Sequence, residues 1–117
     1  MSVLIVARPG RRRDNLRALL KAVPQLNNIN QADDGSAALC LVNGQCPSLI
    51  LLDSSLSEPE TKLVLEQVKT KLPPAHCLVL ADTPEQWRLA EASHADAVLA
   101  ADFSIANFLT ATENLLN

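Results

Sequence analysis

The sequence predicts a three-layer α/β fold, with one parallel five-stranded sheet covered by helices on both faces. Short apolar segments alternate along the chain with longer segments whose apolar residues recur at helical spacing. The segments Val3–Val6 and Ser48–Asp53 are apolar without alternation, which is typical of strands buried on both faces of a parallel sheet. Right-handed crossovers and a weak, polar second strand favour a doubly wound (βα)5 sheet with the strand order 2-1-3-4-5.

The first half of the chain is predicted to form two strand–helix units. Val3–Val6 is a buried strand, and Arg8–Gly10 ends it. Asn28–Ala32 has few apolar residues, which is typical of a strand at the edge of a sheet. Asp33–Ser36 is a turn and helix-start signal, and the helix after it stops near Gly44. The helix between these strands is indicated by apolar residues at helical spacing, namely Leu16, Leu19, Leu20 and Val23.

Three further strand–helix units are predicted, and the first of them contains the strand that ends at Asp53. Ser57 can cap a helix, Pro59 is tolerated in its first turn, and the acids beside it suit the positive end of the helix dipole. The remaining expected elements are the strand His76–Ala81, a short helix opened by Asp82–Glu85, the strand Ala97–Ala100 and a last helix after Asp102–Ser104.

The composition fits a single domain over residues 1–117. Apolar residues make up 48% of the chain and aromatic residues only 3%, so the core is expected to be mainly aliphatic. No apolar run reaches membrane-spanning length and the start is not a signal peptide, so we expect a cytoplasmic protein without a membrane partner. The net charge of -3 argues against nucleic acid as the partner of this domain.

The residues that most often bind metals or act as nucleophiles form no pattern. Cys40, Cys46 and Cys77 are odd in number and lack metal-ligand spacing, so buried, reduced thiols are expected. His76 and His94 are isolated at the ends of predicted elements. We therefore predict no metal site built from these residue types.

Four segments in order resemble the receiver domains of two-component response regulators, and the likeness extends over essentially the whole chain. They are Val3–Leu20, Ala32–Leu39, Pro47–Asp53 and His94–Leu99. The resemblance implies a CheY-like, or flavodoxin-like, fold and a role in phosphorelay signal transduction. It also implies that Asp53 corresponds to the aspartate on which receivers accept a phosphoryl group.

The other site positions depart from the receiver pattern. Receivers hold a divalent cation with an acidic pair at the end of the first strand, where this chain has Ala7 and Arg8. They place a Thr or Ser after the fourth strand and a Lys after the fifth, where this chain has Ala81 and Ala101. The accessory residues that could compensate are Asp82, Thr83 and Asp102.

We therefore expect a pseudo-receiver that signals through protein–protein contact, without catalysis, a bound metal or another cofactor. The alternative is a functional phosphoacceptor that a histidine kinase phosphorylates on Asp53 with Mg²⁺. The expected partner is a histidine kinase, an effector, or a second copy bound through the fourth helix, fifth strand and last helix. A flavodoxin-like enzyme or nucleotide binder is disfavoured, because Gly10, Gly35 and Gly44 lack phosphate-loop spacing.

Three local questions stay open at the level of sequence. Arg8 either pairs with Asp53 in place of a metal or points to solvent. The cluster Arg11–Arg13 either binds an anion or acidic partner, or is a solvated run of charge. The acids expected near the strand ends either rebuild a cation site or serve as turn and cap residues; they are Asp33, Asp34, Asp53, Asp82 and Asp102.

Overall fold

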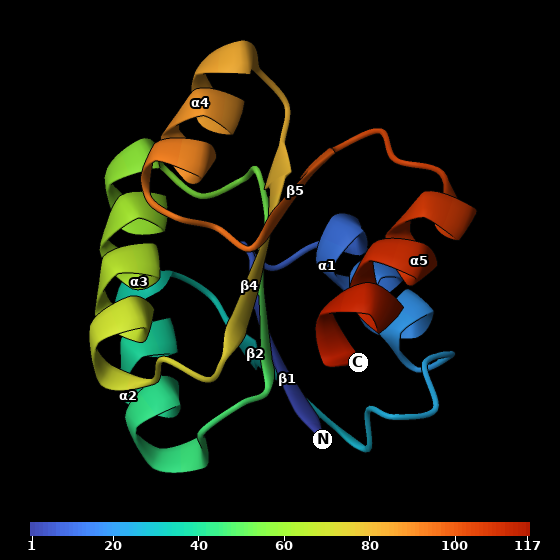
Figure 1. Ribbon diagram of the computed structural model, residues 1–117. Coiled ribbons are helices and arrows are strands. Elements are labelled where there is room, and N and C mark those ends of the chain that lie inside the picture. Colours follow the sequence, from blue (N-terminus) through green and yellow to red (C-terminus); the bar gives the residue numbers. More distant parts are fainter.

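Five strands alternate with five helices in the computed structural model, which describes residues 1–117 (Figure 1). The strands are β1 (Ser2–Val6), β2 (Asn28–Ala32), β3 (Leu49–Leu52), β4 (His76–Ala81) and β5 (Ala97–Ala100). The helices are α1 (Arg11–Leu20), α2 (Gly35–Gln45), α3 (Glu58–Lys71), α4 (Pro84–Ala92) and α5 (Ile105–Leu116). None of these helices is long and apolar enough to cross a membrane.

The five strands form one parallel sheet in the order β2-β1-β3-β4-β5, which confirms the predicted topology. Val6 at the end of β1 pairs with Ala32 of β2 on one side and with Leu52 of β3 on the other. From β1 the chain continues to β2 at one edge of the sheet, whereas from β3 it continues to β4 and β5 towards the other edge. The order in which strands are added therefore reverses between β1 and β3. The carboxyl ends of these two strands therefore flank the crevice where ligands and chemistry are found in doubly wound folds.

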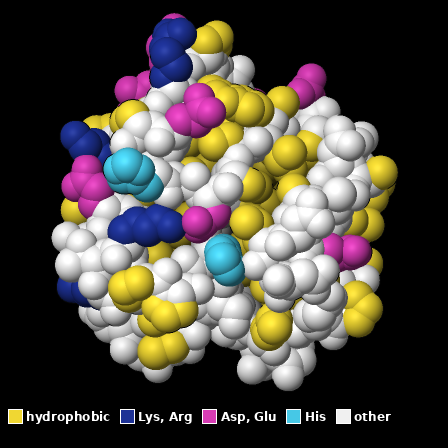
Figure 2. All heavy atoms as spheres, in the orientation of Figure 1, with side chains coloured by type: hydrophobic (Ala, Val, Ile, Leu, Met, Phe, Trp, Pro, Cys, Tyr) yellow, Lys and Arg dark blue, Asp and Glu magenta, His cyan; other side chains and the backbone are white.

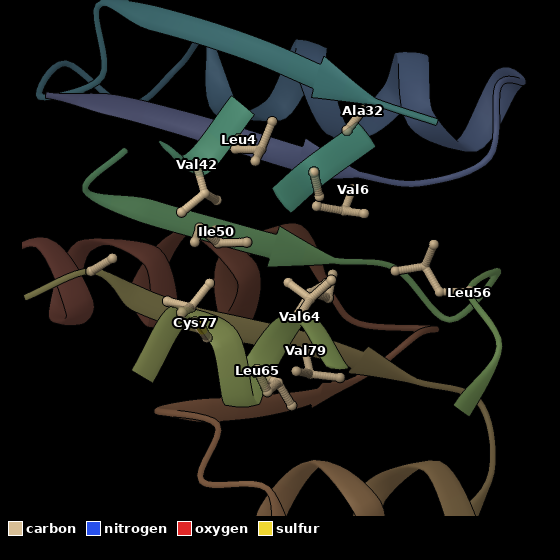
Figure 3. Packing of buried hydrophobic residues seen from close by; sticks show 14 of the residues in the cluster. Leu4, Val6, Ala32, Val42, Ile50, Leu56, Val64, Leu65, Cys77 and Val79 are labelled. Atoms are coloured by element: carbon tan, nitrogen blue, oxygen red, sulfur yellow. The ribbon is translucent and has the colours of Figure 1, made fainter. Parts of the chain in front are cut away.

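The sheet is buried on both faces, so its central strands are apolar at every position. Helices α2, α3 and α4 lie on one face and α1 and α5 on the other (Figure 1). Leu4 and Ile50 point into the core beneath α2–α4, which Figure 3 shows from close by. Ile5 and Leu51, their neighbours in sequence, point into the second core beneath α1 and α5. This explains why the strands lack the polar alternation of a half-exposed sheet.

The edge strand β2 is polar, as predicted, and only Ala32 among its residues is buried. Its outer side is partly covered, because Arg17 of α1 donates a hydrogen bond to the Ile29 carbonyl at 3.2 Å. The opposite edge is different. β5 consists of four apolar residues, the first three of them half-buried, and carries no charge.

Side-chain caps set the start of four helices. Asp34 and Ser104 cap α2 and α5. Ser57 and Glu60 form a complete capping box at the start of α3. The Thr83 hydroxyl accepts the Gln86 N–H at 3.1 Å at the start of α4, and this N-cap bond is what the Thr83 side chain contributes here.

The cysteines correct one prediction, because Cys40 and Cys46 are exposed and only Cys77 is buried. Helix α2 turns Ala38 inward, and Cys40, two residues later, falls on the opposite face of the helix. Cys46 follows α2 at its C-cap. Burial in β4, aided by the nearby charge of Asp96, raises the pKa of the Cys77 thiol to about 12, so it stays protonated and unreactive.

Candidate functional site

Asp53 lies at the carboxyl end of β3, in the crevice between β1 and β3. Its backbone N–H donates to the Val6 carbonyl at 3.0 Å, which continues the pairing of these strands by one residue. Its side chain is only 1% exposed. A carboxylate this deeply buried is costly to maintain unless a cation or several hydrogen-bond donors stabilise it.

A guanidinium and a backbone amide satisfy the Asp53 carboxylate. The Arg12 Nε atom lies 2.6 Å from Asp53 Oδ1. The second carboxylate oxygen accepts the Ser55 N–H at 3.2 Å. Arg12 belongs to the first turn of α1, and this turn brings its side chain, 43% exposed, over the end of β3. The crevice thus contains its own cation.

Arg8 follows neither alternative that the sequence left open, because it does not pair with Asp53 and its guanidinium is bound within the chain. Its guanidinium forms an ion pair with Glu60 of α3 and donates to the Asp33 carbonyl at 3.0 Å. Its backbone N–H donates to the Ser55 hydroxyl at 3.2 Å. The acceptors at the end of β2 and the start of α3 hold Arg8 there, while Arg12 approaches Asp53 from α1.

Glu60 is the most strongly hydrogen-bonded acid at this edge of the sheet. Partial burial by itself raises the pKa of a carboxyl group, but here it is outweighed. The Gly35 backbone N–H, the Arg8 guanidinium and the N–H and hydroxyl of Ser57 all donate to Glu60. These bonds lower the pKa of Glu60 from 4.5 to about 2, so it remains an anion and a fixed partner for Arg8.

This pKa predicts a defined acid sensitivity. Because the pKa of folded Glu60 lies below its unfolded value, the bonds contribute stability above pH 4.5 and lose it as the pH falls towards 2. Since the group is near solvent, we expect a loss of about 1 kcal/mol over this range. Thermal unfolding of wild type and Glu60→Gln from neutral to acid pH measures it. The difference between the two proteins should shrink below pH 4.5, and a constant difference would contradict the assignment.

The arginine cluster is only partly solvated, and two of its members form ion pairs within the chain. Arg12 pairs with Asp53, and Arg13 pairs with Asp33 while donating to the Ala7 carbonyl at 3.4 Å. Neither the anion site nor the solvated run anticipated from the sequence describes these two residues. Arg11 is exposed and takes part in no ion pair.

None of the remaining site positions brings a side chain into contact with Asp53. Ala7 and Ala81 are buried, so methyl groups occupy the places where receivers have an acid and a hydroxyl. The Ala101 N–H donates to the Ala81 carbonyl at 2.9 Å, which closes the end of the sheet. Asp82 and Asp102 are exposed on the loops that follow β4 and β5.

A divalent cation does not fit this set of residues. No three His, Cys, Asp or Glu side chains come together in a geometry that could hold a metal ion. Asp34 caps α2 and Asp33 pairs with Arg13, so these acids serve the turn and the fold rather than a rebuilt cation site. At Asp53 the Arg12 guanidinium already contacts Oδ1, and the Ser55 N–H already donates to Oδ2.

Sequence reasoning missed three residues that shape this site, namely Arg12, Glu60 and Gln86. Arg12 could have been proposed from its place in the first turn of the first helix, because that turn lies at the carboxyl edge of the sheet. Glu60 stands three residues after Ser57, which is a capping-box signal, but its second role as partner of Arg8 has no local signal. Gln86 stands three residues after Thr83 and carries the same capping-box signal, but its contact with Ser54 has no local signal.

Comparison with known proteins establishes the fold. No family model matches the chain, and neither does any curated protein. Among solved structures, the signal receiver domain of the response regulator NarL from Mycobacterium tuberculosis matches with a TM-score of 0.84 at 23% identity, covering 97% of this chain and 93% of that chain. The signal receiver domain of an HD domain-containing protein from Pseudomonas fluorescens Pf-5 matches with a TM-score of 0.85 at 19% identity, covering 98% and 93%.

A third match is the chemotaxis protein CheY4 of Vibrio cholerae, with a TM-score of 0.78 and 19% identity over 97% of both chains. These proteins share the receiver architecture over nearly their full lengths. This chain therefore has the CheY-like fold of response-regulator receiver domains, as the sequence predicted.

Proposed function

We propose that this chain is a pseudo-receiver, which signals through protein–protein contact and does not use metal-dependent phosphorylation of Asp53. The observation that carries the proposal is the contact of 2.6 Å between Arg12 Nε and the buried Asp53 carboxylate. It gives the site a permanent positive partner where a receiver depends on an added one.

The chemistry of phosphoryl transfer explains why this contact matters. A carboxylate can attack a phosphoryl group only when a free oxygen faces it and a cation offsets the negative charges that meet. Here one Asp53 oxygen accepts from Arg12 and the other from the Ser55 N–H. Ala81 and Ala101 offer neither a hydroxyl nor an ammonium group to the phosphoryl oxygens. We infer that the protein acts without catalysis and without a cofactor.

The surface over α4, β5 and α5 supports the proposed role in protein binding. β5 is an open edge of the sheet, and Ala97, Val98 and Leu99 on it are only half-buried. Figure 2 shows hydrophobic side chains gathered over β5, between α4 and α5. Trp87 on α4 is also half-buried. A histidine kinase, an effector or a second copy of the chain is the proposed partner for this face.

The direct test is exposure of the protein to acetyl phosphate and Mg²⁺, followed by measurement of the intact mass. We expect no phosphoryl adduct on the wild-type chain. An Asp53→Asn variant is the matched control, and a phosphorylatable receiver domain treated in parallel verifies the reagent. An adduct on the wild type that the Asn variant lacks would overturn the proposal and establish a phosphoacceptor instead.

A further inference from the structure

We propose that Gln86 is a latch that couples α4 to the loop after Asp53, so that the Arg12–Asp53 pair holds α4 in place. The inference deepens the proposed function, on which it rests in treating the Arg12–Asp53 pair as the resident state of the site. It names the connection through which that site acts on the α4 surface.

Gln86 bridges two loops with the two ends of its side-chain amide. Its Oε1 atom accepts the Asp82 backbone N–H at 2.6 Å, and its Nε2 atom donates to the Ser54 carbonyl at 3.2 Å. A backbone N–H can only donate and a carbonyl can only accept, so both bonds require this one orientation of the amide. The β4–α4 loop and the β3–α3 loop are thereby joined across 32 residues of sequence.

The latch modifies an ordinary helix start. At α3 the third residue, Glu60, returns its side chain to the N–H of the capping residue Ser57. Gln86 occupies the same position of α4, after the cap Thr83, but accepts from the N–H one residue earlier. A Glu at this position could also accept that bond. Only an amide has a donor left to reach the neighbouring loop, so the choice of Gln over Glu carries the coupling.

The segment that Gln86 contacts is held from the opposite side by Arg12. Asp53 bonds to Arg12, and the next residue, Ser54, gives its carbonyl to Gln86. Asp53, Ser54 and Gln86 line the same small pocket between the ends of β3 and β4. Because the two contacts fall on adjacent residues, a movement of Asp53 on release from Arg12 displaces the carbonyl on which α4 is anchored.

The first experiment isolates the latch with amide hydrogen exchange of the wild type and Gln86→Glu. The variant keeps the acceptor for the Asp82 N–H and loses the donor to Ser54. We expect exchange at Ser55 and Leu56, and at the Gln86 and Trp87 amides in the first turn of α4, to quicken roughly twofold to tenfold, the range for one net hydrogen bond. Gln67→Glu, the same change on α3, should leave Ser55 and Leu56 unaffected. Unchanged exchange at these two amides in Gln86→Glu would refute the latch.

The second experiment tests the coupling with a double variant that removes the site pair without leaving a buried charge. Arg12→Met with Asp53→Asn should raise the exchange rate of the Gln86 and Trp87 amides in the otherwise wild-type chain. In the Gln86→Glu background the same pair of changes should have no effect on these amides. An equal increase in both backgrounds would show that α4 does not depend on Gln86.

These measurements use no phosphate donor and no metal, so they are separate from the test of phosphorylation. A phosphoryl adduct on Asp53 together with a positive exchange result would overturn the pseudo-receiver and retain the latch. Absence of the adduct together with unchanged exchange in Gln86→Glu would retain the pseudo-receiver and overturn the latch.

Discussion

Replacement of Arg12 by Met is expected to destabilise the protein by about 2 kcal/mol at neutral pH. The substitution leaves Asp53 buried and charged with only the Ser55 N–H as a donor. Loss of one partner from a fully buried ion pair costs about 3–5 kcal/mol, whereas an exposed pair contributes about 0–1 kcal/mol. Since Asp53 is buried and Arg12 is 43% exposed, an intermediate value follows.

A double-mutant cycle in urea measures this effect and assigns it to the pair. Addition of Asp53→Asn to Arg12→Met should restore most of the lost stability, because no charge then remains buried. Arg11→Met is the matched control, since Arg11 is exposed and unpaired one residue away. A loss below about 0.5 kcal/mol in Arg12→Met, or the same loss in Arg11→Met, would contradict the role given to this pair.

Truncation of Phe108 is expected to have the largest effect on stability, about 3–5 kcal/mol for Phe108→Ala. Phe108 is fully buried in the core beneath α1 and α5. Its ring stacks on that of Phe103 with centroids 4.8 Å apart. The surrounding core is aliphatic and close-packed, so the volume left by the ring cannot be refilled without rearrangement.

Denaturant unfolding of Phe108→Ala and of a milder companion tests this expectation. The total stability of a domain this size is only about 5–15 kcal/mol, so Phe108→Ala can approach complete unfolding. Phe108→Leu keeps most of the volume and should cost under about 2 kcal/mol. Phe103→Ala, at a half-buried position, should cost less than Phe108→Ala. The reverse order of these two alanine variants would show that the core is organised differently.

The fold was predictable because its signals are local and repeat along the chain. The expected strands at Asn28–Ala32, His76–Ala81 and Ala97–Ala100 are confirmed with the same boundaries. Apolar runs without alternation indicate strands that are buried on both faces of a sheet. The polar β2 segment indicates a strand at the edge of the sheet. The exposure of Cys40 was missed because the cysteines were judged from their number and spacing, and not from the position of Cys40 two residues after the inward-facing Ala38 of α2.

The site was predictable in its location but not in its contacts. Asp53 was expected at the carboxyl end of the third strand, and it lies there. Which arginine reaches it depends on how α1 sits over the sheet and on which acids compete for each guanidinium. Arg8 is adjacent to the strand end in sequence, yet Glu60, far along the chain, holds it away. Long-range competition of this kind leaves no pattern in the local sequence.

The central claim is that the Arg12 guanidinium takes the place of an added cation at Asp53, and a Mg²⁺ titration followed by amide NMR tests it most directly. We expect no saturable shift of the Arg8, Asp53 and Ser55 amides as Mg²⁺ rises through the millimolar range. That result would mean that Mg²⁺ does not bind beside Asp53, as expected when the Arg12 guanidinium already contacts its carboxylate. A saturable shift confined to these amides, and abolished by Asp53→Asn, would contradict the claim and show that Mg²⁺ displaces Arg12.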